Sequence, residues 1–313
     1  MTDSTAGAPT RLAVVVAGVR LASPLVLASG VLGTSASSMD LVARHGLGAV
    51  TTKSFSLDER SGHKGPTLVA FDHGFLNAVG LSNPGWEAAT AEIRAFKARS
   101  DTKVIASIFG RTAEEYGRIA EHAASAAPDL IEVNVSCPNV ASELGTPFEA
   151  DAAVLGRITG DVKRAAGAIP VSIKLSSNFG VIGRMARVCE DHGADAITAI
   201  NTVGPGMIID VNARRPVLSN GAGGVSGPAI LPIAVRSVYE VARAVKLPII
   251  GTGGVASAED ALQLVLAGAT AVGIGTALYE GLEVVDRVNR GLESYLAREG
   301  LDSLDAIRGA AHA

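Results

Sequence analysis

The sequence predicts an α/β fold in which strands and helices alternate around a closed barrel, and two observations carry this prediction. First, short apolar runs rich in β-branched residues recur eight times, as in strands buried on both faces of a parallel sheet. Second, the segments between them carry helix signals, including the capping boxes Thr112-Ala-Glu-Glu115 and Ser257-Ala-Glu-Asp260. Eight such units in one chain favour a (β/α)8 TIM barrel over an open doubly wound sheet, which is the structural alternative. The eight runs are residues 24–29, 49–54, 103–108, 130–136, 170–175, 196–201, 248–253 and 271–276.

Three segments fall outside this repeat. Residues 11–22 indicate a β-hairpin that turns near Ala17-Gly18, and it could plug the bottom face of the barrel. Residues 55–85 and 204–231 are long segments after the second and sixth runs, and we expect long loops there that line the site at the C-terminal face. We expect residues 1–10 to be a flexible tail and residues 11–313 to form one barrel domain.

Composition excludes several classes of protein. The formal net charge is −4 and no basic cluster is present, so we expect no nucleic-acid partner. Two cysteines are too few for a disulfide framework or for the usual four ligands of an iron–sulfur cluster. The first ten residues do not resemble a signal peptide, and no apolar stretch is long enough to span a membrane. We therefore expect a soluble cytoplasmic protein with no metal site.

The site of such a barrel lies at the C-terminal ends of its strands, where this sequence places two lysines and several amides or hydroxyls. Lys53 and Lys174 directly follow apolar strand residues, and a lysine at a barrel mouth can offset the charge of an anionic ligand. A solvated surface lysine is the alternative for each. The polar strand ends are Ser29, Lys53, Ser54, Ser107, Asn134, Lys174, Asn201, Thr202 and Thr276.

The last two runs end in Gly-Thr-Gly-Gly (251–254) and Gly-Ile-Gly-Thr (273–276), a pattern that suits a phosphate. Glycine allows backbone N–H groups to approach phosphate oxygens, although tight turns alone would also explain either motif. The glycine-rich run 221–227 does not indicate a dinucleotide site, because no strand precedes it and no suitably spaced acid follows.

The two cysteines have different surroundings. Cys189 lies in an amphipathic helical segment and we assign it no role beyond packing. Cys137 follows the fourth run and lies between Asn134 and Asn139, next to Pro138, where a thiol can reach a bound substrate.

These motifs resemble those of class 1 dihydroorotate dehydrogenases from about residue 11 to residue 300. NAVGLSNPG (77–85) and NVSCPN (134–139) together are highly specific. The remaining matches are LASG (27–30), TTKSFSL (51–57), VSIKLS (171–176), INTVGPGMIID (200–210), GGVSGPAI (223–230), IIGTGGV (249–255) and GIGTA (273–277). The chain departs from the family at residues 61–67, where the family has an Asn- and Pro-rich stretch that ends in arginine.

The resemblance implies oxidation of (S)-dihydroorotate to orotate in de novo UMP synthesis, with FMN as cofactor and Cys137 as the base. Substrate contacts would come from Lys53, Asn77, Ala78, Val79, Gly80, Leu81, Asn134, Asn201 and Thr202, with Asn139 as a further candidate. FMN contacts would come from Ser29, Lys53, Ser54, Ser107, Asn134, Lys174, Ile200, Gly227, Gly253, Gly254, Gly275 and Thr276.

The run 200–210, the following Arg214-Arg215-Pro216 and the run 223–230 resemble class 1B. That class passes electrons to NAD⁺ through a partner subunit with FAD and a [2Fe–2S] cluster, around a homodimeric core that makes a heterotetramer. The alternatives are a fumarate-dependent class 1A-like enzyme, a dihydropyrimidine dehydrogenase-like flavoprotein and a non-catalytic barrel.

Overall fold

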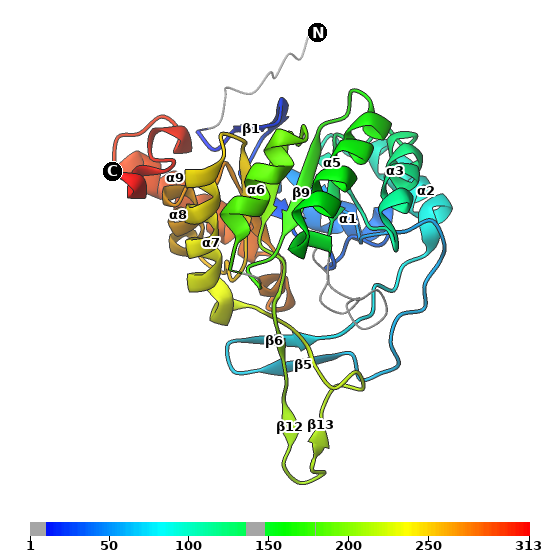
Figure 1. Ribbon diagram of the computed structural model, residues 1–313. Coiled ribbons are helices and arrows are strands. Elements are labelled where there is room, and N and C mark those ends of the chain that lie inside the picture. The colour runs from blue at the N-terminus through cyan, green and yellow to red at the C-terminus, as the bar shows by residue number, and fades with distance from the viewer. Residues whose placement is uncertain (1–10, 136–147, 179) are drawn as a thin grey trace.

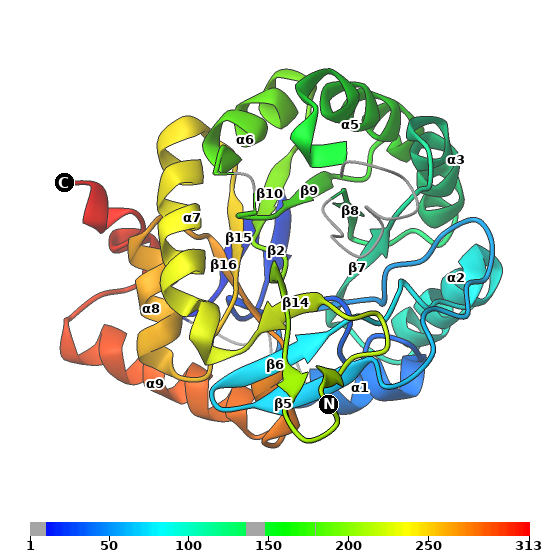
Figure 2. The same ribbon diagram turned by 60° about the horizontal axis from the view of Figure 1, so that its bottom comes forward.

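The computed structural model describes residues 11–135, 148–178 and 180–313. Within these residues, eight parallel strands close into a barrel, and their order around it follows their order along the chain (Figure 2). The prediction of a (β/α)8 barrel is therefore confirmed. The barrel strands are β3 (Leu25–Leu27), β4 (Ala49–Thr51), β7 (Lys103–Ile108), β8 (Leu130–Asn134), β9 (Val171–Leu175), β10 (Ala196–Ala199), β15 (Ile249–Thr252) and β16 (Ala271–Ile274).

An outer ring of helices covers the barrel. Aromatic side chains such as Tyr116, Phe55 and Phe96 are fully buried in the layer between strands and helices. The helices are α1 (Ala36–Ala43), α2 (Gly85–Lys97), α3 (Ala113–Ala124), α5 (Ala152–Ala166), α6 (Ile182–Asp191), α7 (Leu231–Ala244), α8 (Ala258–Leu266) and α9 (Val284–Arg298). Short 3₁₀ turns are Phe148–Ala150, Pro228–Ile230, Thr276–Tyr279, Leu304–Ala306 and Ala310–His312.

The two predicted capping boxes are realised differently. Ser257 forms the complete box with Asp260 at the start of α8. At the start of α3, Thr112 Oγ1 accepts from the backbone N–H of Glu115 at 3.3 Å. The Glu115 carboxylate instead accepts from the N–H of Arg111 at 2.8 Å, so only half of the predicted box forms.

The N-terminal hairpin closes one end of the barrel, as the sequence predicts. Strands β1 (Val14–Val16) and β2 (Val19–Leu21) pair antiparallel around Ala17-Gly18. The buried side chains of Val14, Val16 and Leu21 form a cluster with residues near the N-terminal ends of the barrel strands, including Ile105 and Ile250.

The two long segments at the opposite end form a sheet, which the sequence did not predict. Strands β5 (Leu68–Phe71) and β6 (Gly74–Asn77) come from the first segment, and β11 (Val203–Gly206) and β14 (Gly223–Ser226) from the second. They pair in the order β11-β14-β6-β5, and Figure 1 shows this sheet beneath the barrel. The sheet therefore covers the C-terminal ends of the barrel strands.

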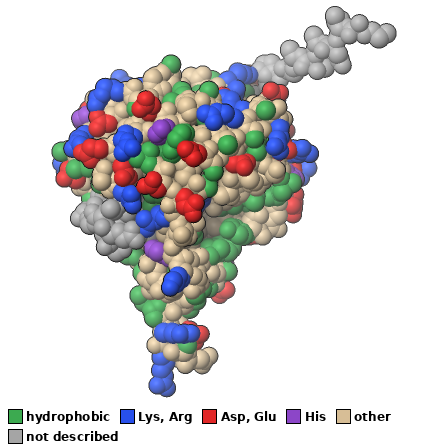
Figure 3. Space-filling view, turned by 90° about the vertical axis from the view of Figure 1, so that its right-hand side faces the viewer, with side chains coloured by type: hydrophobic (Ala, Val, Ile, Leu, Met, Phe, Trp, Pro, Cys, Tyr) green, Lys and Arg blue, Asp and Glu red, His purple; other side chains and the backbone are tan. Residues whose placement is uncertain are grey.

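A two-stranded arm, β12 (Ile209–Asp210) and β13 (Arg215–Pro216), projects beyond this sheet (Figure 1). Figure 3 shows acidic and basic side chains mixed over the barrel and basic ones at the tip of the arm. None of the helices formed by the described residues combines the length and the apolar character needed to cross a membrane.

Candidate functional site

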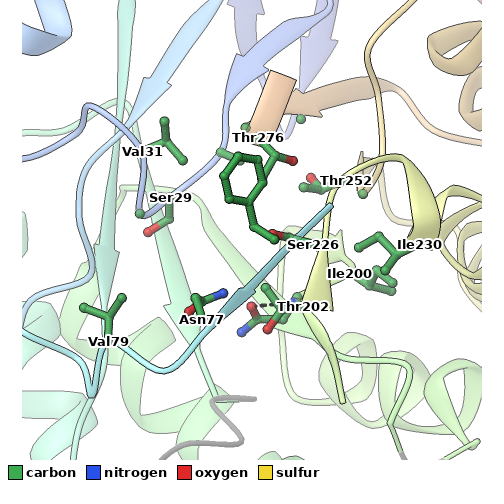
Figure 4. A pocket seen from close by; sticks show the side chains of 18 of the residues that line it. Ser29, Val31, Asn77, Val79, Ile200, Thr202, Ser226, Ile230, Thr252 and Thr276 are labelled. Carbon is green, nitrogen blue, oxygen red and sulfur yellow. Dashed lines mark hydrogen bonds between the residues drawn. The ribbon is translucent and has the colours of Figure 1, made fainter. Parts of the chain in front are cut away.

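A cavity opens at the C-terminal end of the barrel, between the strand ends and the covering sheet. Among the described residues, seven of the eight barrel strands contribute to its lining at or just after their C-terminal ends, and β7 does not. Figure 4 shows Ser29 and Val31 on one side of this cavity and Ile200 and Ile230 on the other. The lining thus joins residues that are more than two hundred positions apart in the chain.

Most of the predicted site residues meet in this cavity. Those in its lining are Ser29, Lys53, Ser54, Asn77, Val79, Gly80, Leu81, Asn134, Lys174, Ile200, Asn201, Thr202, Gly227, Gly253, Gly254, Gly275 and Thr276. Cys137 and Asn139 lie outside the described residues, so the structure does not place the predicted base.

Two predicted contact residues do not line the cavity. Ala78 is fully buried against Leu76 and Leu218, and its backbone N–H donates to Thr67 O at 2.8 Å. Ser107 is also fully buried, and its hydroxyl lies behind Ser54 at an oxygen–oxygen distance of 2.8 Å. The sequence cannot distinguish a hydroxyl that lines the cavity from one in the layer behind it. The hydroxyls of Ser54 and Ser107 both lie in the interior of the barrel.

The cavity lining favours an anionic ligand. Among the described lining residues, Lys53 and Lys174 carry positive charge and none carries negative charge. Lys174 is only 6% exposed, so it is not the solvated surface lysine that the sequence left as an alternative. Its ammonium nitrogen lies 3.5 Å from a carboxylate oxygen of Glu132, a buried residue on β8 that sequence reasoning missed. The available signal was an acid inside an apolar run, two residues before Asn134.

Three amide side chains occupy one part of the lining. Asn201 Nδ2 donates to Asn134 Oδ1 at 3.3 Å, and Asn134 Nδ2 donates to Ser54 Oγ at 3.5 Å. Asn77 Nδ2 donates to the backbone oxygen of Gly224 at 3.2 Å, which ties β6 to β14. Amides offer both donors and acceptors, so this part of the cavity suits a ring that presents both.

Two different reasons account for the glycines that line the cavity. A side chain at Gly253 or Gly254 would collide with α7, because a Cβ atom would lie 2.8 Å from Ala234 Cβ or 2.7 Å from Leu231 N. At Gly275, a Cβ atom would meet nothing closer than Ala28 Cβ at 3.4 Å. Internal packing therefore explains the first pair. At Gly275 a Cβ atom would make only ordinary van der Waals contacts, with Ala28 and Val31, and all three residues line the cavity, where the Gly275 backbone is accessible to a ligand.

Other lining residues were not predicted. Thr252 and Ser226 add hydroxyls to the lining. Phe75 and Tyr279 both line the cavity, and their ring centroids are 4.9 Å apart. Thr252 could have been found within the motif 251–254, whereas Phe75 depends on the unforeseen sheet.

An arginine, Arg60, directly precedes residues 61–67, where the sequence departs from the pattern of the resembling family. Arg60 Nε donates to Gly80 O at 2.7 Å, and the backbones of Arg60 and Asn83 form a β-bridge. Gly80 and Leu81 line the cavity, so Arg60 supports this wall from behind.

Comparison with known proteins gives a consistent picture. The family model for dihydroorotate dehydrogenase matches residues 11–296. The catalytic subunit of dihydroorotate dehydrogenase B (NAD(+)) from Methanothermobacter thermautotrophicus is 44% identical over 298 residues, covering 95% of this chain and 97% of that protein. The same subunit from Methanosarcina mazei is 42% identical over 296 residues, or 94% of this chain and 93% of the relative. The same subunit from Geotalea daltonii is 42% identical over 301 residues, which cover 96% of this chain and 97% of the relative.

Proposed function

Because the chain belongs to the dihydroorotate dehydrogenase family, we propose that it oxidises (S)-dihydroorotate to orotate in pyrimidine biosynthesis. One observation carries the proposal most directly: two lysines, three asparagine amides and an open glycine backbone line one cavity at the catalytic end of the barrel. A carboxylate on a six-membered ring with amide-like edges fits these groups.

FMN is the proposed cofactor. The open backbone at Gly275 and the hydroxyl of Thr276 suit a phosphate, and Lys174 lies where it can offset negative charge on a flavin ring. Bound FMN supplies a two-electron acceptor for the hydride at C6 of the substrate. The protein has to hold the substrate ring against it and exclude water, which the covering sheet helps to do.

Substrate binding is assigned to the amide side of the cavity. Lys53 pairs with the carboxylate, and Asn77, Asn134 and Asn201 face the polar edges of the ring. Thr202 and the backbone of residues 79–81 complete the proposed pocket.

Cys137 is the proposed base that takes the C5 proton, on the strength of the NVSCPN motif. An ordinary thiol, with a pKa of about 8.5, is mostly protonated at neutral pH. The rate of flavin reduction by dihydroorotate should therefore rise with pH toward the pKa of this thiol. Cys137→Ala should still bind orotate but reduce FMN far more slowly in stopped flow, whereas Cys189→Ala is the matched control. Near-normal reduction by Cys137→Ala would refute the assignment.

The proposed electron acceptor is NAD⁺, which the names of the relatives include, reached through a second subunit with FAD and a [2Fe–2S] cluster. The complete enzyme would then be a heterotetramer around a homodimer of this chain. Co-purification with an iron–sulfur flavoprotein supports this assignment, and steady turnover of the isolated chain with fumarate would contradict it.

The visible spectrum of the purified protein tests the proposed function in one experiment. We expect a flavin spectrum that bleaches when dihydroorotate is added without oxygen. A colourless protein would contradict the flavin, and bleaching by dihydrouracil in place of dihydroorotate would indicate a dihydropyrimidine dehydrogenase-like enzyme.

A further inference from the structure

A buried acid lies behind the cavity wall and contacts groups that face the cavity. Glu132 is 3% exposed and lies on β8, two residues before Asn134. It is absent from the lining, yet its Oε1 atom lies 3.5 Å from Lys174 Nζ and accepts from Ser107 Oγ at 3.1 Å. Burying a carboxylate costs free energy unless the group is paired and hydrogen-bonded. Here the partners are Lys174, which lines the cavity, and Ser107, which contacts the lining residue Ser54.

The first contact concerns charge. Lys174 lines the cavity, and Glu132, which does not, lies 3.5 Å from the Lys174 ammonium group. In a poorly solvated interior, opposite charges at this distance interact strongly. Glu132 therefore moderates the positive potential that Lys174 presents to any ligand in the cavity.

The second contact fixes the direction of a hydrogen-bond chain. An ionised carboxylate can only accept, and a serine hydroxyl has one hydrogen to donate. Since Ser107 gives its hydrogen to Glu132, Ser54 must be the donor in the 2.8 Å contact between Ser54 Oγ and Ser107 Oγ. Ser54 Oγ is then left as an acceptor on its cavity side.

The Ser54 hydroxyl oxygen, as an acceptor, determines the orientation of the amide groups of Asn134 and Asn201. Ser54 Oγ accepts from Asn134 Nδ2 at 3.5 Å, which turns Asn134 Oδ1 toward Asn201. Asn134 Oδ1 accepts from Asn201 Nδ2 at 3.3 Å, and Asn201 Oδ1 accepts from the N–H of Thr202 at 2.8 Å. The hydrogen bonds of this chain from Asn201 onward thus run toward Glu132, and the orientation of both amides matches an acceptor at the end of the chain.

We propose that Glu132 is a positioning residue for the cofactor and substrate. Its carboxylate balances the Lys174 ammonium beside the cofactor and, through Ser107 and Ser54, orients the amides of Asn134 and Asn201 for the substrate ring. This inference rests on the proposed function, because it assigns the cavity to a flavin and a pyrimidine carboxylate.

Two variants separate the two effects. Glu132→Gln keeps the size of the side chain, removes its charge and introduces a donor that can reverse the chain. Ser107→Ala interrupts the chain between Ser54 and Glu132 but leaves the Lys174 pair intact. Ser172→Ala is the matched control, because Ser172 is an equally buried serine on β9 whose hydroxyl hydrogen-bonds to Thr198 at 2.9 Å.

The measurements are the midpoint potential of the bound flavin and the dissociation constant of orotate, from spectral titration of the flavin. In Glu132→Gln the unbalanced ammonium should favour the reduced, more negative flavin about tenfold, which moves the potential of a two-electron couple by about +30 mV. Both Glu132→Gln and Ser107→Ala should weaken orotate binding about three- to tenfold, the equivalent of one hydrogen bond. Ser107→Ala should leave the potential unchanged, and Glu132→Asp should restore the potential toward that of the parent.

The inference fails if Glu132→Gln retains both the potential and the orotate affinity of the parent. It also fails if Ser172→Ala weakens orotate binding as much as Ser107→Ala does. If Glu132→Gln does not fold, Ser107→Ala decides, since parental orotate affinity in that variant would overturn the chain. A parent protein without flavin, or one that dihydroorotate does not reduce, would overturn the proposed function and this inference together. If the parent is reduced normally and only the variants give the contrary results, the inference alone is wrong.

Discussion

Glu149 should make the stability of this protein fall as the pH rises through neutrality. The side chain is 2% exposed and lies in the turn before α5, where it accepts from the backbone N–H of Ser176 at 2.8 Å and from the Ser176 hydroxyl. Burial raises the pKa of this carboxyl from 4.5 to about 7, although the bonds from Ser176 act in the opposite direction. Desolvation of the charged form therefore dominates.

The direction of the change in stability with pH follows from the number of protons that the folded and unfolded states bind. Between pH 4.5 and pH 7 the folded protein holds a proton on Glu149 that the unfolded chain releases, so folding is favoured at the acidic end of this window. The contribution is complete below about pH 4.5 and is lost as the pH rises through about 7. At about 1.4 kcal/mol for each pH unit between the two pKa values, the loss amounts to about 3 kcal/mol.

Glu149→Gln removes this titration while preserving the shape of the side chain. Urea unfolding of the parent and the variant, both with bound cofactor, should be compared at pH 5, 6, 7 and 8. The free energy of unfolding of the parent should fall relative to the variant by about 2.5 kcal/mol across this range. The exposed residue Glu121, on α3, provides the control Glu121→Gln, which removes a carboxylate outside the protein interior. A constant difference between parent and Glu149→Gln would refute the reasoning.

Three further predictions concern other parts of the molecule. Gly275→Ala should fold normally, because its methyl group meets no protein atom closer than 3.4 Å, but it should bind FMN at least about tenfold more weakly in a fluorescence titration of the apoprotein. Val16→Ala, at 2% exposed in the barrel plug, should lower the free energy of unfolding in urea by about 2 kcal/mol without changing the rate of flavin reduction. Cys189 should resist thiol reagents in native protein at pH 8, as judged by mass spectrometry, because burial raises its pKa to about 12. Rapid native labelling of Cys189 would contradict this last prediction.

The barrel could be read from the sequence because its strands are buried on both faces and leave continuous apolar runs. The ends of the strands could not be read as well. The runs 49–54 and 271–276 become strands that end at Thr51 and Ile274, so the polar residues after them lie beyond the strands, on a loop after β4 and at the start of a 3₁₀ turn after β16. Hydrophobicity reports burial, and burial continues past the last ladder hydrogen bond.

The covering sheet was invisible for a different reason. It pairs β6 with β14, so that Asn77 lies opposite Gly224, far along the chain. Its strands are short, and glycines replace the apolar signal because the backbones approach closely. A Cβ atom at Gly223 would lie 2.3 Å from Asn77 O, and one at Gly224 would lie 2.1 Å from Thr202 Oγ1. Packing within the sheet and against Thr202 therefore requires glycine at 223 and 224, and no dinucleotide site is needed to explain these two residues.

The sequence located residues that line the cavity more readily than residues in the layer behind its wall, while the binding roles of both remain predictions. Lys53, Asn77 and Asn201 lie in the lining as predicted. Ser107 was predicted as a direct contact but lies one layer behind Ser54. Glu132 was missed although an acid inside an apolar run is a signal, because that signal alone does not show which groups the acid contacts. Positions in the second layer depend on the tilt of the strands around the closed barrel, and that tilt is a property of the assembled fold.

The structure distinguishes between glycines that the sequence alone cannot tell apart, at the ends of the last two barrel strands. Both motifs suggested a phosphate, yet α7 occupies the Cβ positions of Gly253 and Gly254, so those two residues would be glycine in any barrel packed this way. Gly275 meets no such constraint from the described residues around it. The proposed phosphate would account for glycine at that position, and this is why Gly275→Ala tests the phosphate assignment, whereas a substitution at Gly254 would also disturb the packing of α7.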